Sequence, residues 1–322
     1  MTAVRVSPAT LVNDTISAFD KINGRHAGFR PAHAKGILLA GAFTPSAAAK
    51  TLARAPHFER PSTPVSVRFS NFAGVPNIAD NHRDAGPRGM AVRFHLGPHV
   101  HTDIIAHSTD GFPARTAQEF LEFLRAAGES GPDQPHPNPI EQFLGSHPAA
   151  LQFLQTPKPV PASFASENFF SVSAYRFTNW AGTSQFGRYR LIPAGGTQYL
   201  DDTTAAQMGP NFLFEDIVAR LEAGGVAFHI VVQLAGEGDV IDDATVRWPE
   251  SRMLLNLGTL ELKSTVPENE AEQRHVIFDP IPRVDGIDAS KDPLLQPRAD
   301  VYLVSGRRRR ADGPRVDSHL GE

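Results

Sequence analysis

Residues 64–70 read Pro-Val-Ser-Val-Arg-Phe-Ser, and the order of these side chains indicates a β-strand. Successive side chains of a strand point to opposite faces of its sheet. Apolar and polar residues alternate in that way here, with Val65, Val67 and Phe69 on one side and Ser66, Arg68 and Ser70 on the other. The stretch therefore predicts a strand with one apolar and one polar face.

Further segments on both sides of this stretch have the composition and length of strands: Met90–Leu96, Phe169–Phe177, Arg188–Ile192, Ala227–Leu234 and Met253–Leu262. Others carry apolar residues at helical spacing: Ala9–Ile22, Thr116–Ala127, Pro139–Leu154 and Phe212–Ala223. Strands grouped in the middle of the chain, with helices around them, predict an α+β fold built on a largely antiparallel sheet or barrel.

The composition is that of an ordinary globular protein of 322 residues, with 41% hydrophobic and 20% charged residues. The proline-rich segments Gly131–Pro139 and Pro157–Pro161 fit connections better than linkers, so we expect a single domain over residues 1–322. A formal charge of −4 argues against general nucleic-acid binding. Residues 1–23 do not resemble a signal peptide, and no apolar run is long enough to cross a membrane, so we expect no membrane association and a cytoplasmic location.

Two compositional features bear on chemistry. Cysteine is absent, which excludes disulfides, thiol nucleophiles and cysteine-ligated zinc, iron–sulfur or haem centres. The cations comprise 25 arginines and only 6 lysines. Arginine is favoured where a carboxylate must be held in a fixed planar geometry, although a GC-rich genome would also explain the excess.

The last helical pattern starts at Asp292-Pro293 and is expected to end near Gly306, with Pro297 distorting its first turns. Arg298 and Tyr302 lie four residues apart, so they share one helix face. An arginine beside a phenol favours the phenolate, which is a strong anionic ligand for ferric haem iron. The alternative is a surface arginine that stacks on a tyrosine.

The run Arg307–Arg310 follows directly. It fits a solvated basic helix end, a nucleic-acid patch, or a place where one arginine binds an anionic cofactor group beside the tyrosine.

Four separated segments resemble haem catalases, in the order expected of that family. The first is Arg30-Pro31-Ala32-His33-Ala34-Lys35-Gly36, and the second is Arg68-Phe69-Ser70 with Ala73-Gly74. The third, Arg83-Asp84 followed by Pro87-Arg88-Gly89-Met90-Ala91-Val92-Arg93-Phe94, has two extra residues, Ala85 and Gly86. The fourth comprises Phe278-Asp279-Pro280, Gly286-Ile287-Asp288 and Gln296-Pro297-Arg298 through Tyr302.

The chain is most similar in extent to the small, catalase-related peroxidase branch of this superfamily. The resemblance implies an antiparallel eight-stranded β-barrel with surrounding helices that holds haem b. It also implies a chain without the long N-terminal arm and without the C-terminal helical or flavodoxin-like domain of full catalases. Because those parts build much of the usual tetramer, we expect a homo-oligomer such as a dimer.

The resemblance also assigns expected roles residue by residue. His33 matches the distal acid–base, Ser70 the residue that orients it, and Tyr302 the iron ligand with Arg298 as its charge partner. Arginines that bind the haem propionates are matched by Arg30, Arg68 and Arg309. Aromatic residues of the distal pocket and channel are matched by Phe112 and Phe120.

One position departs from the family pattern. Where catalases have an asparagine near the distal iron face, this chain reads Ala106-His107-Ser108-Thr109-Asp110. An ungapped alignment puts His107 at the asparagine, and a shifted one offers Asp110. Since the asparagine supplies a neutral amide donor, the change argues against efficient dismutation.

We therefore expect a haem-dependent peroxidase that uses hydrogen peroxide or an organic hydroperoxide to oxidise small organic donors, with at most weak catalase activity. One alternative is a lipid-hydroperoxide dehydratase similar to allene oxide synthases, and another is a non-enzymatic haem-binding protein. A third is a non-haem metal enzyme, with ligands drawn from His95, His99, His101 and His107.

Overall fold

The structure is a computed structural model that describes residues 7–131 and 133–313. Its strands are β1 (Gly36–Pro45), β2 (Thr63–Ser70), β3 (Gly89–Gly97), β4 (Val100–His107), β5 (Phe169–Phe170), β6 (Tyr175–Thr178), β7 (Ser184–Pro193), β8 (Val226–Leu234), β9 (Leu254–Thr265) and β10 (Ile287–Ala289). Its α-helices are α1 (Pro8–Asn23), α2 (Ala47–Leu52), α3 (Pro56–Glu59), α4 (Ala117–Glu129), α5 (Pro139–Ser146), α6 (Pro148–Gln155), α7 (Asp202–Gln207), α8 (Phe212–Glu222), α9 (Asn269–His275) and α10 (Leu295–Ala311).

The strands form one antiparallel sheet that closes on itself. Neighbours follow the order β10-β6-β7-β5-β4-β3-β2-β1-β9-β8, and β8 pairs back onto β7. The closed part contains β1 to β5 and β7 to β9, which is the eight-stranded barrel that the resemblance implied, while β6 and β10 extend it at one edge. The predicted fold class is confirmed.

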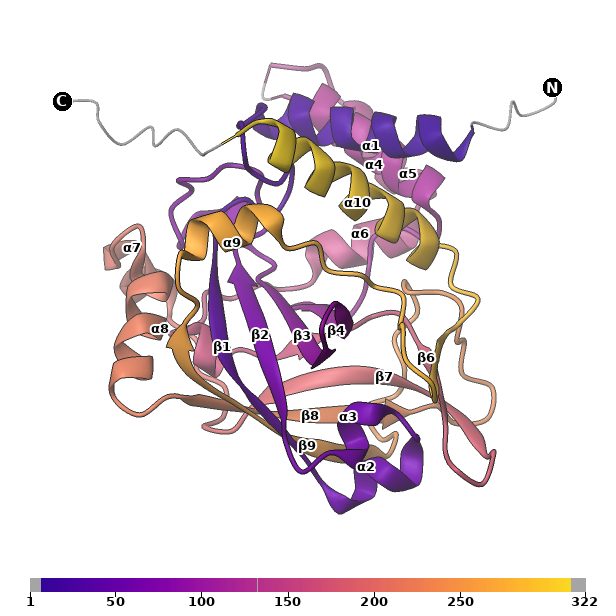
Figure 1. The fold of residues 1–322 in the computed structure, drawn as a ribbon. Helices are drawn as coiled ribbons and strands as arrows, with labels where there is room; N and C mark the ends of the chain where they lie inside the picture. The colour runs from indigo at the N-terminus through magenta and orange to yellow at the C-terminus, as the bar shows by residue number, and fades with distance from the viewer. Residues whose placement is uncertain (1–6, 132, 314–322) are drawn as a thin grey trace.

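Helices cover the barrel on several sides. In Figure 1, α1, α4, α5 and α10 gather above the barrel, α7 and α8 lie at its left, and α2 and α3 lie below. The helix ends follow from the sequence. Ser7 caps α1 by accepting from the Thr10 amide, and Thr116 and Glu119 form a reciprocal capping box at the start of α4.

Phenylalanines fill the barrel. Phe69 on β2 stacks on Phe164 at 5.1 Å between ring centroids and also contacts Phe169 and Phe228. Val65 and Val67 share its face and are buried with it, as the alternation predicted. The polar face of the same strand is also buried near its end, because helices cover Arg68 and Ser70 from outside the barrel. β2 therefore has the core on one face and a covered polar site on the other.

Two predicted elements are divided in the structure. The expected strand Phe169–Phe177 is β5 and β6, because the chain leaves β4 after Phe170 and pairs with β10 from Tyr175. The expected helix Pro139–Leu154 is α5 and α6, because Pro148 has no N–H to continue the first helix and instead begins the second.

The last helix differs from the prediction at both ends. The Asp292 carboxylate accepts from the Leu294 amide at 2.9 Å, forming a turn before α10 begins at Leu295. Pro297 is therefore the third helical residue, where no intrahelical hydrogen bond is lost. Gly306 does not end the helix, which continues to Ala311. Its missing side chain makes room for Ile277, whose Cδ1 lies 2.3 Å from an ideal Cβ at residue 306.

Candidate functional site

A large cavity lies between the outer face of β2, β3 and β4 and the helices α1, α4 and α10. Its empty space, including the open mouth, is about 1520 Å³. The ten residues that the resemblance matched to the haem site all line this cavity: Arg30, His33, Arg68, Ser70, His107, Phe112, Phe120, Arg298, Tyr302 and Arg309. Segments from the two ends of the chain thus meet in one place.

His33 is held in a fixed but unusual backbone conformation. Its φ of 58° is in the left-handed region, which is uncommon for a residue other than glycine. The amide of His33 donates to the carbonyl of Phe72 at 2.6 Å, and the next amide, of Ala34, donates to Ala73. These two hydrogen bonds tie the histidine loop to the segment that follows β2.

The ring of His33 is oriented by two neighbours. Its Nδ1 lies 3.0 Å from the hydroxyl oxygen of Ser70, and its ring is nearly perpendicular to that of Phe72, with 5.4 Å between centroids. Desolvation lowers the pKa of His33 to about 3, and the positive charges of Arg68 and Arg30 act in the same direction. The imidazole is therefore neutral at ordinary pH and able to accept a proton.

His107 ends β4 in the same cavity. Its Nδ1 accepts a long hydrogen bond of 3.4 Å from the Thr109 amide, so the neutral ring carries its proton on Nε2. Desolvation, followed by the charges of Arg298 and Lys158, lowers the pKa of His107 to about 3. The Nε2 atom is buried and has no partner within the described residues. Asp110, the residue that a shifted alignment offered, instead forms a bidentate ion pair with Arg190 at 2.9 Å.

Arg298 and Tyr302 lie one turn apart on α10, as predicted. The Arg298 Nη2 atom donates to the Tyr302 oxygen at 3.4 Å, and its guanidinium carbon lies 5.9 Å from the centre of the tyrosine ring. Desolvation lowers the pKa of Arg298, but Tyr302, Tyr175 and Asp292 together raise it above its usual value. Both side chains are partly buried and line the cavity, so the pair does not lie on the outer surface.

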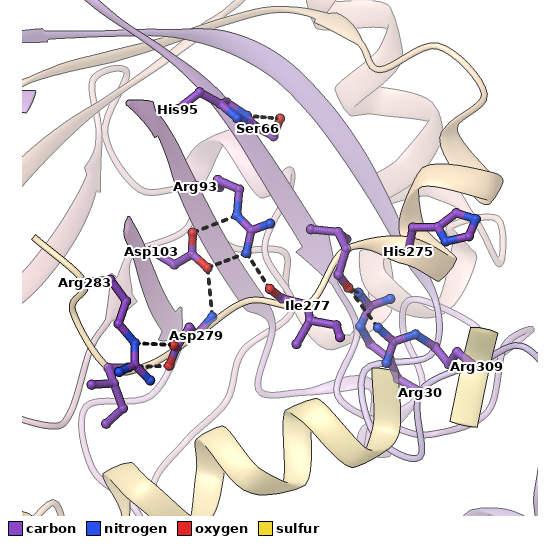
Figure 2. Close-up of polar contacts among 12 residues, drawn as sticks. Arg30, Ser66, Arg93, His95, Asp103, His275, Ile277, Asp279, Arg283 and Arg309 are labelled. Atoms are coloured by element: carbon purple, nitrogen blue, oxygen red, sulfur yellow. Dashed lines mark hydrogen bonds and ion pairs between the residues drawn. The ribbon is translucent and has the colours of Figure 1, made fainter. Parts of the chain in front are cut away.

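Three further arginines form a cluster at the cavity wall. Arg68 donates from Nε to the Gln273 side chain at 2.9 Å and from Nη2 to the His33 carbonyl at 2.9 Å. Arg30 and Arg309 both donate to the carbonyl of Val276, at 3.1 and 2.8 Å. Figure 2 shows these two arginines side by side. Their geometry is fixed by the protein itself, as carboxylate recognition requires.

Three arginines of the basic run Arg307–Arg310 have different environments. Arg308 forms a bidentate ion pair with Asp20 on α1, and Arg310 donates to the carbonyl of His275. Arg309 is buried and faces the cavity, as the third interpretation of this run required.

The cavity lining carries a strong charge imbalance. It includes the four arginines at positions 30, 68, 298 and 309, and in the described part of the chain it contains no aspartate or glutamate. An anionic ligand would be favoured there. Since a phenol and an imidazole share the lining and apolar side chains supply most of the rest, the residues present fit a haem with its two carboxylates.

Several lining residues were not among the predicted site residues. Helix α1 contributes Leu11, Thr15 and Phe19, which are four residues apart and so share one face. Phe153 of α6 and the segment 276–278 also line the cavity. The helical spacing on α1 was visible in the sequence, but the sequence did not show that this face covers a cavity.

The histidines of the non-haem alternative do not gather. His95 and His101 pair across β3 and β4, whereas His107 lies at the far end of β4. Within residues 7–131 and 133–313, no group of three or more His, Asp or Glu side chains is arranged to hold a metal ion. None of the helices in these two ranges has the length and apolar character needed to span a membrane.

Comparison with known proteins agrees with this geometry. A family model described as Catalase matches residues 7–317. The catalase-related peroxidase of Mycolicibacterium paratuberculosis is 34% identical over 296 residues, covering 91% of this chain and 93% of that protein. The catalase-related peroxidase of Synechococcus elongatus is 29% identical, and the match covers 92% of this chain and 88% of that protein.

Solved structures show the same fold. A fungal catalase superposes with a TM-score of 0.77 at 23% identity, covering 94% of this chain and 62% of its own. A bacterial catalase superposes with a TM-score of 0.77 at 22% identity, and the match covers 95% of this chain and 63% of that catalase. The chain thus spans less than two thirds of these larger catalases, whereas it matches the catalase-related peroxidases over nearly their whole length. The chain belongs to the catalase family, within its small, catalase-related branch.

Proposed function

We propose that the protein is a haem-dependent peroxidase that uses hydrogen peroxide or an organic hydroperoxide to oxidise small organic donors. One observation carries this proposal. An imidazole held by a serine and a phenol held by an arginine line the same cavity, whose lining includes four arginines and no acid among the described residues. The similarity to proteins named catalase-related peroxidase supports it.

Each lining group would have a distinct task. Haem b, when bound, supplies a redox-active ferric iron that reacts with peroxide. Tyr302 would ligate that iron with Arg298 as its charge partner. The propionates would be bound by Arg30, Arg68 and Arg309, and Phe112 and Phe120 would line the approach.

His33 would move the proton during peroxide cleavage. Its neutral ring can take the proton from one peroxide oxygen and return it to the other, which leaves as water or alcohol. Ser70 would keep the ring in the orientation for this transfer through its 3.0 Å contact with Nδ1. His107, fixed as a neutral Nε2–H donor, would offer a hydrogen bond where catalases offer an amide.

The apolar part of the lining supports organic substrates. Leu11, Phe19, Phe120 and Phe153 come from three helices and line the same cavity as the arginine cluster. Such a surface favours organic hydroperoxides and aromatic donors through burial of apolar area.

The test is to mix the purified holoprotein with hydrogen peroxide or cumene hydroperoxide, with and without a reducing dye. Haem absorption, oxygen evolution and dye oxidation are followed together. We expect a Soret band, dye oxidation that depends on peroxide, and little oxygen. A colourless protein would contradict haem binding. Rapid oxygen release without dye oxidation, or conversion of a lipid hydroperoxide that consumes no donor, would contradict the peroxidase assignment.

A further inference from the structure

A short segment between α9 and α10 touches both the barrel and the arginine cluster. We call Val276–Asp279 the strap. Ile277 packs against α10 in the space left by Gly306, and the Phe278 ring lies 5.2 Å below the guanidinium of Arg93. The strap is thus enclosed between β3 and the helix that carries Tyr302.

One end of the strap is bound by an ion pair on the barrel. Arg93 on β3 and Asp103 on β4 are direct cross-strand partners and form a bidentate pair at 2.9 and 2.7 Å. The Asp103 side chain is fully buried and that of Arg93 is 13% exposed. Figure 2 shows that both also contact the strap. Arg93 donates to the Ile277 carbonyl, and Asp103 accepts from the Asp279 amide at 2.8 Å.

The other end of the strap positions two cavity arginines. The carbonyl of Val276 accepts from both Arg30 and Arg309, which come from opposite ends of the chain. Its direction therefore helps to set where two of the positive charges in the cavity lie, together with the Gln273 carbonyl, which accepts from Arg30, and the Ser305 hydroxyl, which accepts from Arg309. The ion pair and this carbonyl are joined by a single residue, Ile277, so a shift of one is transmitted to the other.

A stability role alone does not account for this pair. Burial of an ion pair contributes little net stability, because the desolvation of both charges offsets their attraction. Here each partner also makes a hydrogen bond to the strap backbone, so the pair fixes a position.

We propose that Arg93 and Asp103 are positioning residues that set the affinity of the cavity for ligand carboxylates, by fixing the strap that directs Arg30 and Arg309. The inference rests on the proposed haem binding and deepens it. Neither residue lines the cavity, so the effect is indirect.

The experiment compares haem with haem dimethyl ester, whose propionates cannot carry charge. Dissociation rates of both are measured spectroscopically, by transfer to an acceptor haem protein, for the wild type, Asp103→Asn and the double variant Arg93→Met/Asp103→Leu. The double variant leaves no unpaired buried charge, so it is expected to fold even if Asp103→Asn does not. The matched control is Arg176→Met/Asp288→Leu, which removes an exposed cross-strand ion pair of β6 and β10.

We expect the wild type to release haem more slowly than it releases the dimethyl ester. The quantity compared between proteins is the ratio of these two dissociation half-lives, haem over ester. In the Arg93/Asp103 variants this ratio should fall about tenfold, the scale of one charge-assisted hydrogen bond, while ester retention changes little. An equal loss for both ligands, or an unchanged ratio, would overturn the inference. A wild type that binds no haem would instead contradict the proposed function, so the two failures are distinguishable.

Discussion

Gly89 lies so close to His33 that a Cβ atom at residue 89 would fall 2.9 Å from the histidine Nδ1 and 2.6 Å from the Ser70 hydroxyl. The contact between His33 and Ser70 therefore depends on the absence of a side chain on the neighbouring strand. Gly89→Ala should push the imidazole away from its orientation. We expect the rate of reaction with peroxide to fall by up to about 10²-fold, since a displacement near 1 Å can cost that much.

The matched control for this change is Gly195→Ala, because a Cβ there meets nothing within 4 Å. Stopped-flow measurement of the haem spectrum after mixing with peroxide separates the two variants. Equal rates for Gly89→Ala and the wild type would show that His33 is not held by this contact.

His33→Ala should slow the reaction with peroxide by about 10²–10⁴-fold, the usual contribution of a positioned acid–base. Haem content should remain close to that of the wild type, because the proposed iron ligand, Tyr302, lies on α10 and is unchanged. His26→Ala is the control, since this partly exposed histidine is seven residues earlier and outside the cavity lining. Near-normal kinetics in His33→Ala would exclude the acid–base role.

The pH dependence follows from the lowered pKa of His33. A base with a pKa of about 3 is neutral, and so competent, at every pH well above 3. The rate constant for reaction with peroxide should thus be flat between pH 5 and 8 and decline only in stronger acid. A rate that drops below pH 6.5, as for an ordinary histidine, would show that the ring is not desolvated in the working enzyme.

Tyr302→Phe should weaken haem retention and shift the visible spectrum, because a phenyl ring cannot ligate iron. Tyr199→Phe is the control: Tyr199 donates to Glu167 at 2.8 Å and does not line the cavity. The measurement is the haem-to-protein ratio after gel filtration, with the absorption spectrum. An unchanged spectrum and haem load in Tyr302→Phe would refute the ligand assignment.

Acid should destabilise the fold through His57. This ring is buried between Phe58 and Phe94 at 4.3 and 4.6 Å, and desolvation lowers its pKa to about 3. Between about pH 6.5 and 3 the unfolded chain binds a proton that the native chain does not. The stability present above pH 6.5 is therefore lost as the pH falls, by about 1.4 kcal/mol per pH unit for each such group.

Urea unfolding at pH 7.5 and 5.5 tests this prediction. From pH 7.5 to pH 5.5, the free energy of unfolding should fall less in His57→Phe than in the wild type. The same loss in both proteins would assign the acid sensitivity to other groups.

The sequence predicted those elements whose pattern is local. The alternation in residues 64–70 revealed β2, and helical spacing revealed α1, α4 and α8. β1 was missed because its sequence is nearly all apolar and contains Gly41, which the structure requires at a bulge: a Cβ there would lie 1.9 Å from the Glu261 carbonyl. β4 was not predicted as a strand, because the strand-like alternation of His99 and His101 was interpreted only as a candidate metal site.

The residues that line the cavity could be predicted because they lie in recognisable sequence motifs. The groups that hold these residues in place lie outside the motifs and could not be predicted. Val276 is 246 residues from Arg30, and Gln273 is 205 from Arg68. Contacts of this kind leave no periodic signal in a single chain. The cover formed by α1 and the strap could therefore be found only from the three-dimensional arrangement.

The closure of the barrel has a consequence for how the protein is made. β1 pairs with β9, more than 200 residues later, and the cavity joins a loop before β1 to a helix after β9. Such distant contacts form slowly, because a long loop must close before they stabilise the chain. During synthesis on the ribosome, the loop with His33 emerges long before Tyr302. Haem capture is therefore expected to be a late event, and the appearance of the Soret band would report completion of the whole fold.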